Sequence, residues 1–295
     1  MNHSINTSRR LLLASSLVLT FLSGGNATAA DKIAVTASFS ILGDLVRIVG
    51  GERVAVTTLV GPNEDAHVFE PKPTDVKAIA RTQLLVTNGL SFEPWANKLA
   101  KSAGYKGETV VASTGVKALP SDPHAWQNPN NVELYVRNIA AGLSKVDATG
   151  ASTYQANAEA YVKELQALDA WAKAQFLEIL VVKRKVITSH DAFGYFAAHY
   201  QIKFIAPQGI STEAEPSAKQ VAVLIKQIQR EKIKAIFVEN MSNPKLLAQL
   251  SKDAGATVGA SLYADALSAP DQPGATYLQM MRHNVTQLAA GMRLN

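Results

Sequence analysis

One uninterrupted stretch in the middle of the sequence constrains the fold more than any other feature. Residues 151–180 contain neither glycine nor proline, the two residue types that most readily end a helix. Apolar residues recur through this stretch at spacings of three and four, beginning with Tyr154, Ala158, Tyr161 and Leu165. The pattern predicts one long helix, well beyond the average length of about 11–12 residues.

Strand-like and helix-like segments alternate on both sides of this predicted helix. Before it, short β-type runs and helical patterns alternate at residues 33–37, 41–48, 54–60, 73–81 and 84–87. After it, further β-type runs occur at residues 185–188, 204–205, 235–238 and 257–258. Units of this kind, separated by short glycine and proline turns, predict parallel sheets covered by helices.

The expected fold class is therefore α/β, with two lobes that each have a mainly parallel sheet covered by helices and are joined by one long backbone helix. We predict an N-terminal lobe at residues 31–147, the linking helix at 148–180 and a C-terminal lobe at 181–295. A chain of 295 residues is long enough for two such domains. Ligands of α/β proteins gather at the carboxyl ends of parallel strands, so we expect the binding site between the lobes.

Residues 1–30 predict a secretory signal peptide that is cleaved from the mature protein. Arg9 and Arg10 precede an uncharged apolar run at residues 11–22, and small residues follow at positions 27–30. This run is too short to cross a bilayer as a helix, and no later stretch resembles a membrane span. Because the sequence contains no cysteine for lipid attachment, we expect a soluble protein in the periplasm.

Composition excludes several other classes of protein. The absence of cysteine excludes a disulfide framework, a thiolate metal site and a thiol nucleophile. The formal net charge of +5 falls to +3 without Arg9 and Arg10, too small an excess to indicate nucleic-acid binding. The six histidines are few enough to consider one by one. His3 lies in the predicted signal, whereas His199 and His283 lie in predicted helices, where we expect partly exposed structural roles.

The other three histidines lie at the ends of predicted strands or in loops. His67 follows the run at residues 54–60, His124 lies in a polar loop before a helix, and His190 follows the run at 185–188. These positions place two imidazoles in the first lobe and one in the second, on both sides of the expected cleft. Their intervals match no local zinc-binding pattern, so unrelated polar loop residues remain an alternative interpretation.

The short sequence segments around and between these histidines form an ordered set of five motifs. In chain order, the motifs occupy residues 61–73, 88–95, 122–126, 189–196 and 262–267. They read Gly-Pro-Asn-Glu-Asp-Ala-His with Glu-Pro-Lys-Pro, Asn-Gly-Leu-Ser-Phe-Glu-Pro-Trp, Asp-Pro-His-Ala-Trp, Ser-His-Asp-Ala-Phe-Gly-Tyr-Phe and Leu-Tyr-Ala-Asp-Ala-Leu. The set resembles the zinc/manganese branch of the solute-binding proteins of ABC transporters, over essentially the whole chain after the signal.

This resemblance implies two α/β lobes, a long backbone helix and a set of four metal ligands. Carried over by motif, the ligands are His67, His124, His190 and Asp265. The sequence departs from the family in two respects. Ala66 replaces the proline that often precedes the first ligand, and residues 68–123 lack the histidine-rich insertion frequent in zinc importers.

Three neutral imidazoles and one carboxylate suit a borderline divalent ion such as Zn²⁺. Related manganese carriers often have a carboxylate at the third position, where this chain has His190, so we expect zinc, with Mn²⁺ or Fe²⁺ as the alternative. Asp191 and Glu239 are candidates for contacts behind the ligands, with a solvated or capping role as the alternative for each.

The resemblance thus implies a carrier that captures a divalent transition metal between its lobes and delivers it to the membrane permease and ATPase of an ABC importer. We expect a monomer and no enzymatic activity. A zinc hydrolase is one alternative, but a catalytic zinc usually keeps an open position, whereas four protein ligands would close the coordination sphere. A surface adhesin is the other alternative, although the sequence contains no independent adhesive motif.

Overall fold

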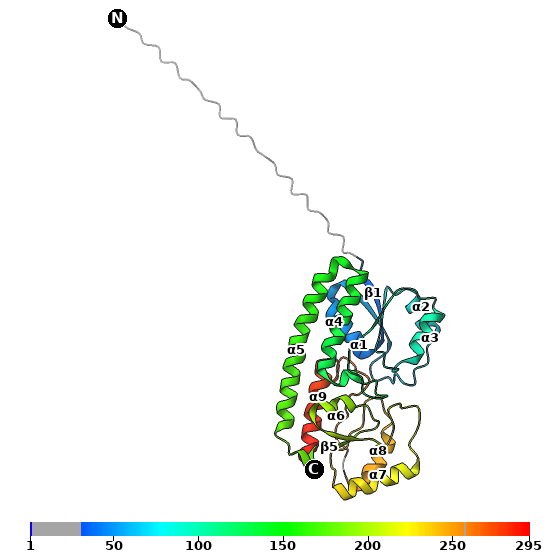
Figure 1. Cartoon of the computed structure of the whole chain (residues 1–295), viewed down its shortest axis with the longest axis vertical. Helices are drawn as coiled ribbons and strands as arrows, with labels where there is room; N and C mark the ends of the chain where they lie inside the picture. The colour runs from blue at the N-terminus through cyan, green and yellow to red at the C-terminus, as the bar shows by residue number, and fades with distance from the viewer. Residues whose placement is uncertain (2–30, 257) are drawn as a thin grey trace. The chain divides into compact units, whose positions relative to one another are not determined.

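The computed structural model describes residue 1, residues 31–256 and residues 258–295. Apart from residue 1, the predicted signal segment lies outside the described residues, as does Thr257 from the last expected strand. Residues 32–295 form one compact unit (Figure 1). The boundaries predicted for the two lobes within this unit stay predictions.

The first half of the unit contains a parallel sheet in which β1 is central and almost fully buried. The strands β1 (Ile33–Phe39), β2 (Val54–Val60), β3 (Leu84–Thr87) and β4 (Glu108–Val111) lie in the order β2-β1-β3-β4. The helices associated with this sheet are α1 (Ser40–Gly50), α2 (Pro73–Ala80), α3 (Pro94–Ser102) and α4 (Pro129–Val146). The three strands and two helices expected in this region are confirmed, and β4 is an addition.

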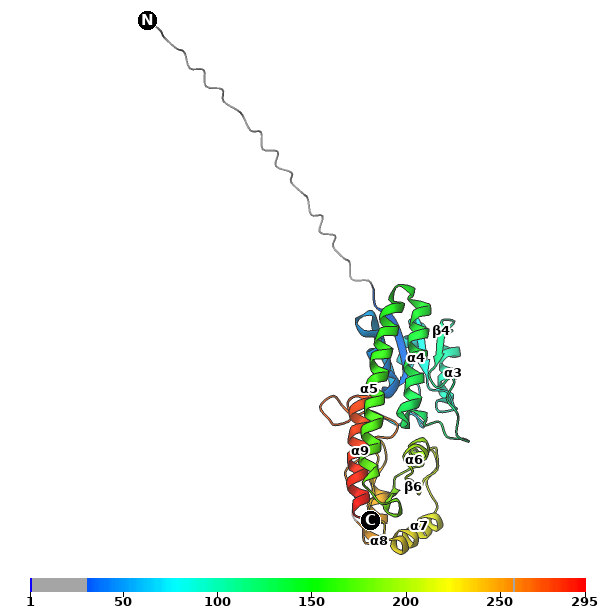
Figure 2. The same cartoon turned by 60° about the vertical axis from the view of Figure 1, so that its left-hand side comes forward.

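The long helix α5 spans residues Ala151–Leu177, which confirms the prediction from its uninterrupted apolar pattern. Its buried face includes Tyr154, Tyr161 and Leu168. It packs against α1 and α4 in the first half of the chain and against α9 (Tyr277–Arg293) in the second. Figure 2 shows it running beside α4 and then beside α9, so one rigid element supports both halves.

The second half is built around a smaller parallel pair, β5 (Lys185–Ile187) and β6 (Lys203–Ile205). The expectation of a full strand at residues 235–238 was wrong, because Ile236 forms only single bridges to Ile187 and to Val258. The chain still runs parallel there, and Phe237 N donates to the carbonyl of Ile187. The remaining named helices are α6 (Gly194–Tyr200), α7 (Ala218–Glu231) and α8 (Pro244–Ala254).

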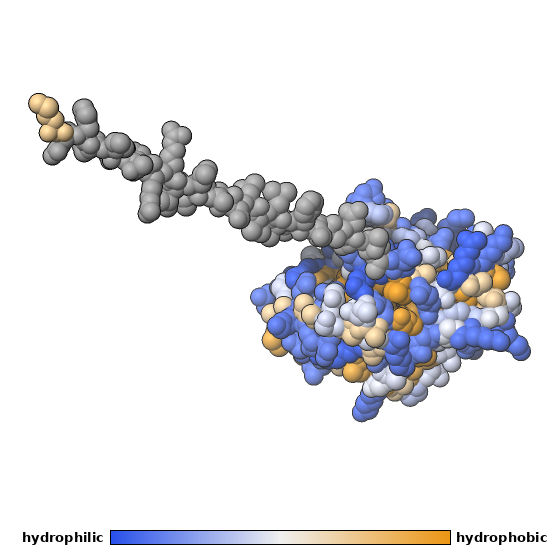
Figure 3. All heavy atoms as spheres, turned by 90° about the horizontal axis from the view of Figure 1, so that it is seen from above, coloured by the Kyte–Doolittle hydropathy of each residue, from blue (hydrophilic) through white to orange (hydrophobic). Residues whose placement is uncertain are grey.

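Short 3₁₀ turns connect several of these elements. They occupy Gly51–Arg53, Ala125–Gln127, Ala148–Gly150 and Val181–Lys183. In the part of the chain that is described, no helix is both long enough and apolar enough to cross a membrane. The face seen in Figure 3 is mostly hydrophilic with smaller apolar patches between. The observed architecture confirms the α/β class with two lobes and a long connecting helix.

Candidate metal centre

The four side chains predicted as ligands converge on one point, although they come from distant parts of the sequence. His67 lies in the loop between β2 and α2, and His124 directly precedes the turn Ala125–Gln127. His190 follows β5, and Asp265 lies in the segment before α9. One ligand atom from each residue lies within 4.8 Å of all the others. The two halves of the chain contribute two residues each.

Four of the distances between these atoms are close to the spacing of ligands around one ion. Nε2 of His67 lies 3.3 Å from Nε2 of His124 and 3.3 Å from Oδ2 of Asp265. Asp265 Oδ2 lies 3.1 Å from Nε2 of His190, and its Oδ1 lies 3.6 Å from Nε2 of His124. Ligands held about 2.0–2.1 Å from a tetrahedral Zn²⁺ are themselves about 3.3–3.4 Å apart. The donor set and its spacing therefore fit one such ion.

Several of these atoms are buried without a hydrogen-bond partner. Within the described residues, Nε2 of His190 and both carboxylate oxygens of Asp265 have none. Both side chains are 0% exposed, so bulk solvent does not compensate for the missing bonds. Buried polar atoms in native proteins are nearly always paired, because leaving one unpaired costs about 1–3 kcal/mol. A bound cation would satisfy all three atoms at once.

Two further carboxylates hold the rings of His124 and His190 from behind. Asp122 Oδ1 accepts hydrogen bonds from Nδ1 of His124 at 2.8 Å and from its backbone N–H at 2.9 Å. Glu239 Oε2 contacts Nδ1 of His190, while its Oε1 accepts from the backbone N–H of Ser189 at 2.8 Å. These contacts leave both Nε2 atoms free to face the centre, as in many metal sites.

The sequence pointed to only one of these two carboxylates. Glu239 was a candidate for this contact, whereas Asp191, the other candidate, is exposed and contacts the carbonyl of Gly209 through its backbone N–H. Asp122 was missed as a contributor to the site. Its signal was the spacing, because an aspartate stands two residues before His124 just as Asp65 stands two residues before His67.

The electrostatics of the site favour positive charge. Burial by itself opposes ionisation, yet the negative charges of Glu239 and Asp265 raise the pKa of His190 well above its ordinary value. Burial likewise opposes the charge on Asp265, but His190 and His124 lower the pKa of this carboxyl well below its usual range. The buried carboxylates thus create a place where a cation is stable.

His67 is held differently from the other two imidazoles. Its side chain is 6% exposed and packs edge-on against the ring of Phe92, with 4.9 Å between ring centroids. Its loop is fixed by Trp95, whose Nε1 donates to the carbonyl of Ala66 at 2.9 Å. In the described part of the chain, Asp265 is the one carboxylate that contacts this ring.

The remaining described histidines lie elsewhere and have protein partners. Nε2 of His199 lies 2.7 Å from Oδ1 of Asp169 on the long helix, and His283 Nε2 donates to the carbonyl of Ser261 at 2.8 Å. Both are partly buried, as expected for structural residues. His3 lies outside the described residues.

Comparisons with known proteins agree with this architecture. The model of the family described as zinc-uptake complex component A, periplasmic, matches residues 35–291. The manganese-binding lipoprotein MntA of Halalkalibacterium halodurans is 31% identical over 274 residues, covering 91% of each chain. The iron-binding protein YfeA of Yersinia pestis is 31% identical over 89% of this chain and 87% of its own.

A solved structure extends the likeness to the fold. The periplasmic zinc binding protein TroA from Treponema pallidum superposes with a TM-score of 0.84 at 25% identity, covering 88% of this chain and 99% of its own. The family model matches far more than half of the sequence. The chain therefore belongs to the family of periplasmic zinc-uptake complex component A, whose members are metal-binding solute-binding proteins of ABC transporters and not enzymes.

Proposed function

We propose that this protein captures one Zn²⁺ ion between its lobes and delivers it to an ABC importer, with His67, His124, His190 and Asp265 as the four ligands. The observation that carries the proposal is the approach of one ligand atom from each residue to within 4.8 Å of the others, together with three buried atoms of His190 and Asp265 that have no hydrogen-bond partner within the described residues. Four protein ligands leave no open position for a reacting water, which suits cargo that must be held and not transformed.

The choice of zinc rests on the chemistry of the ligand set. Three imidazole nitrogens and one carboxylate oxygen suit a borderline ion, and the general order of affinities places Zn²⁺ above Mn²⁺ and Fe²⁺. Relatives of this chain are named for manganese and for iron, so these ions are the alternative cargo. Glu239 contacts His190 from behind and raises the basicity of that nitrogen ligand, which supports a tightly held ion.

The long helix supports a mode of capture with small lobe movements. Because α5 packs against α1 and α4 at one end and α9 at the other, a wide hinge opening would break contacts in both halves. We therefore expect metal binding to order the loops around the site. Small-angle scattering of metal-free and loaded protein should show nearly the same radius of gyration, and a large difference would contradict this expectation.

The partners and location follow from the same proposal. A soluble carrier of this family would dock on its permease at the outer face of the inner membrane, and a cytoplasmic ATPase would drive transport. We propose that the chain is exported through its N-terminal segment, acts in the periplasm and works as a monomer. The apolar run after Arg9 and Arg10 and the absence of cysteine support this location.

Elemental analysis of protein purified from its own host tests the identity of the cargo. We expect one zinc per chain, and Zn²⁺ should displace Mn²⁺ in a competition titration. If the purified chain contains manganese that Zn²⁺ does not displace, zinc is not the cargo, but the assignment of the metal site still holds.

Alanine substitutions test the ligand assignment. His67→Ala and His190→Ala should lower Zn²⁺ affinity strongly, whereas His199→Ala and His283→Ala serve as controls that keep it. Affinity should also fall as the pH drops, because protonated imidazole does not ligate, and the fall should begin above about 6.5 because Glu239 and Asp265 raise the pKa of His190 well above its ordinary value. Equal losses in all four variants, or affinity independent of pH, would contradict the assignment.

A further inference from the structure

A loop of the second half of the chain lies beside the residues that flank His190 and contacts the loop of His67 in the first half. This loop, residues 208–214, follows β6 and precedes α7, and we call it the strap. None of its residues is buried. Apolar packing therefore contributes little to its position, and polar contacts decide where it lies.

On one side, the strap is attached to the residues that flank His190. Gln208 N donates to the carbonyl of Ser189 at 3.3 Å, and Asp191 N donates to the carbonyl of Gly209 at 3.1 Å. The side chain of Gln208 closes the strap on itself, since its Nε2 donates to the carbonyl of Thr212 at 2.9 Å. These bonds fix the base of the strap relative to His190.

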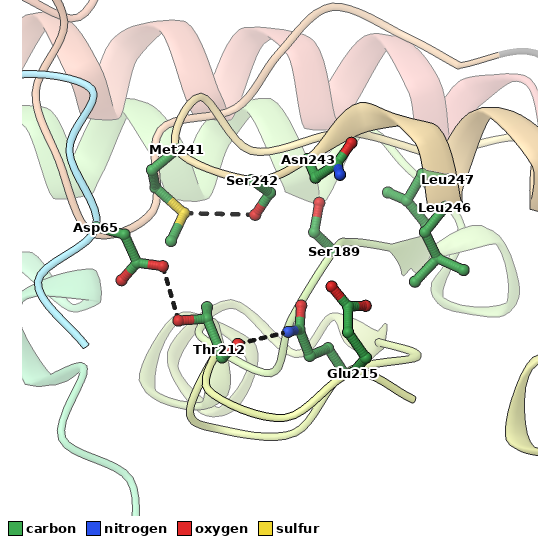
Figure 4. Close-up of a pocket in the computed structure, with 10 residues that line it drawn as sticks. Asp65, Ser189, Thr212, Glu215, Met241, Ser242, Asn243, Leu246 and Leu247 are labelled. Carbon is green, nitrogen blue, oxygen red and sulfur yellow. Dashed lines mark hydrogen bonds between the residues drawn. The ribbon is translucent and has the colours of Figure 1, made fainter. Parts of the chain in front are cut away.

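On the other side, the strap reaches the loop that carries His67. Thr212 Oγ1 donates to Oδ2 of Asp65 at 2.7 Å, and Figure 4 shows the two side chains pointing toward each other. The second oxygen of the same carboxylate, Oδ1, accepts the backbone N–H of His67 at 2.9 Å. Asp65 thus links Thr212 from one half of the chain to a ligand of the other half.

A cavity beside this connection separates the strap from α8. Its volume is about 200 Å³, and its lining includes Asp65, Ser189, Thr212 and Ser242 (Figure 4). The strap therefore does not rest on α8 at this point. Breaking the bond between Thr212 and Asp65 would free the tip of the strap without removing a side chain from the core.

We infer that Thr212 and Asp65 are positioning residues for His67, and that their hydrogen bond holds the loop of His67 in place against the second half of the chain and so slows the release of a bound metal ion. The inference rests on the proposed function, because it assumes that His67 ligates the ion. Asp65 orients His67 by accepting a hydrogen bond from the backbone N–H of His67. Thr212 belongs to the other half of the chain, so it can hold Asp65 only while the two halves are in contact. Loss of the Thr212 hydroxyl should therefore speed metal release more than it changes folding.

The experiment measures the rate of Zn²⁺ release from the full chain, using an excess of chelator in a stopped-flow instrument. Thr212→Val preserves the branched shape and removes the hydroxyl, so release should become about tenfold faster, as expected for a lost hydrogen bond to a charged group. Thr212→Ser should restore the wild-type rate. Ser211→Ala is the matched control, because within the described residues the Ser211 hydroxyl has one hydrogen bond, accepted from the backbone N–H of Glu213 on the same strap.

A second substitution tests whether the two residues act through one bond. Asp65→Ala should release Zn²⁺ at least as fast as Thr212→Val, and adding Thr212→Val to it should change nothing further. The melting temperature of metal-free Thr212→Val should equal that of the wild type. Release from Thr212→Val at the wild-type rate, or independent effects in the double variant, would overturn the inference. A wild-type chain that binds no Zn²⁺ would instead overturn the proposed function, and the role of the strap with it.

Discussion

The two sides of the site hold the four proposed ligands in different ways. On the C-terminal side, the side chains of His190, Asp265 and Glu239 are all 0% exposed, and the two carboxylates contact the imidazole. On the N-terminal side, His67 is 6% exposed and rests on the ring of Phe92. His124, also from the N-terminal half, lies between these cases, since Asp122 supports its ring.

From this difference we expect the two sides of the site to have separate roles in metal binding. The C-terminal side contains more buried negative charge than one imidazolium can balance, so a cation is needed to satisfy it. The N-terminal side offers in His67 a nitrogen ligand on a loop near the surface. We therefore expect the C-terminal side to dominate affinity, and the loop of His67 to dominate the rates of entry and release.

Replacement of His190 should have the largest effect on metal binding. His190→Ala removes a proposed ligand and the imidazole that both Glu239 and Asp265 contact. Zn²⁺ affinity should fall by more than about 100-fold, since loss of a supporting group alone costs roughly 10–100-fold. Isothermal titration with a competing chelator measures this. A loss smaller than that of any variant on the N-terminal side would break the comparison.

Replacement of His67 should cost less. In His67→Ala, a water molecule can take the vacant position near the surface, as it does in zinc sites that have three protein ligands. The affinity loss should be on the order of 10–100-fold. For a given loss of affinity, the rate of Zn²⁺ release should increase more in His67→Ala than in His190→Ala. The same titration and a chelator-driven release experiment give both values. An affinity loss equal to that of His190→Ala would remove the distinction between the sides.

Neutralising Glu239 should have a smaller effect again. Glu239→Gln keeps the shape and retains an acceptor for the backbone N–H of Ser189, but it removes the charge behind His190. Zn²⁺ affinity should fall by about tenfold. Asp122→Asn removes the charge behind His124 in the same way, so titrating both variants with Zn²⁺ gives a matched comparison. Unchanged affinity in Glu239→Gln would show that the contact is only structural.

The buried carboxylate of Glu93 offers a contrast on the N-terminal side, because it faces no ligand. It accepts hydrogen bonds from Ser38 Oγ at 2.8 Å and from the backbone N–H of Asn88 at 2.5 Å. Asn88 in turn donates through Nδ2 to the carbonyl of Pro123, next to His124. Burial raises the pKa of Glu93 from 4.5 to about 7.

Glu93→Gln should therefore change stability and leave metal affinity unaltered. A pKa that is higher in the folded chain means that stability falls as the pH rises from about 4.5 to about 7, by about 3 kcal/mol in all. Glutamine removes this loss, so the variant should melt at a higher temperature than the wild type at pH 8 and not at pH 4. Thermal scans at both pH values measure this. An equal difference at both would contradict the burial of a charge at Glu93.

Local pattern was sufficient to predict most of the fold. Strand β2 was expected at residues 54–60 and is found there, because β-branched residues such as valine and threonine pack well on a half-buried pleated sheet. Edge strand β4 was not expected, since of Glu108–Val111 only Val110 is buried and its pattern is short. The run at residues 235–238 was expected as a strand, yet its burial reflects packing in the core and not a continuous ladder of hydrogen bonds.

Prediction of the site depended on motifs and not on spacing. The histidines are separated by too many residues for any local rule, and the resemblance to a family selected His67, His124, His190 and Asp265. No local signal joined Thr212 to Asp65, because their hydrogen bond links positions 147 residues apart. Asp122 had a local signal in its spacing to His124, but its contact with the ring required the structure.

The order of residues alone determined the alternating elements, the long central helix and the types of side chain available to a metal ion. These properties depend on interactions between near neighbours in the chain, which periodicity records. The tertiary structure decided which carboxylate supports which imidazole, how deeply each proposed ligand is buried and which loop contacts the loop of His67. Such contacts arise only when distant segments pack together, because burial and charge pairing depend on the whole surrounding fold.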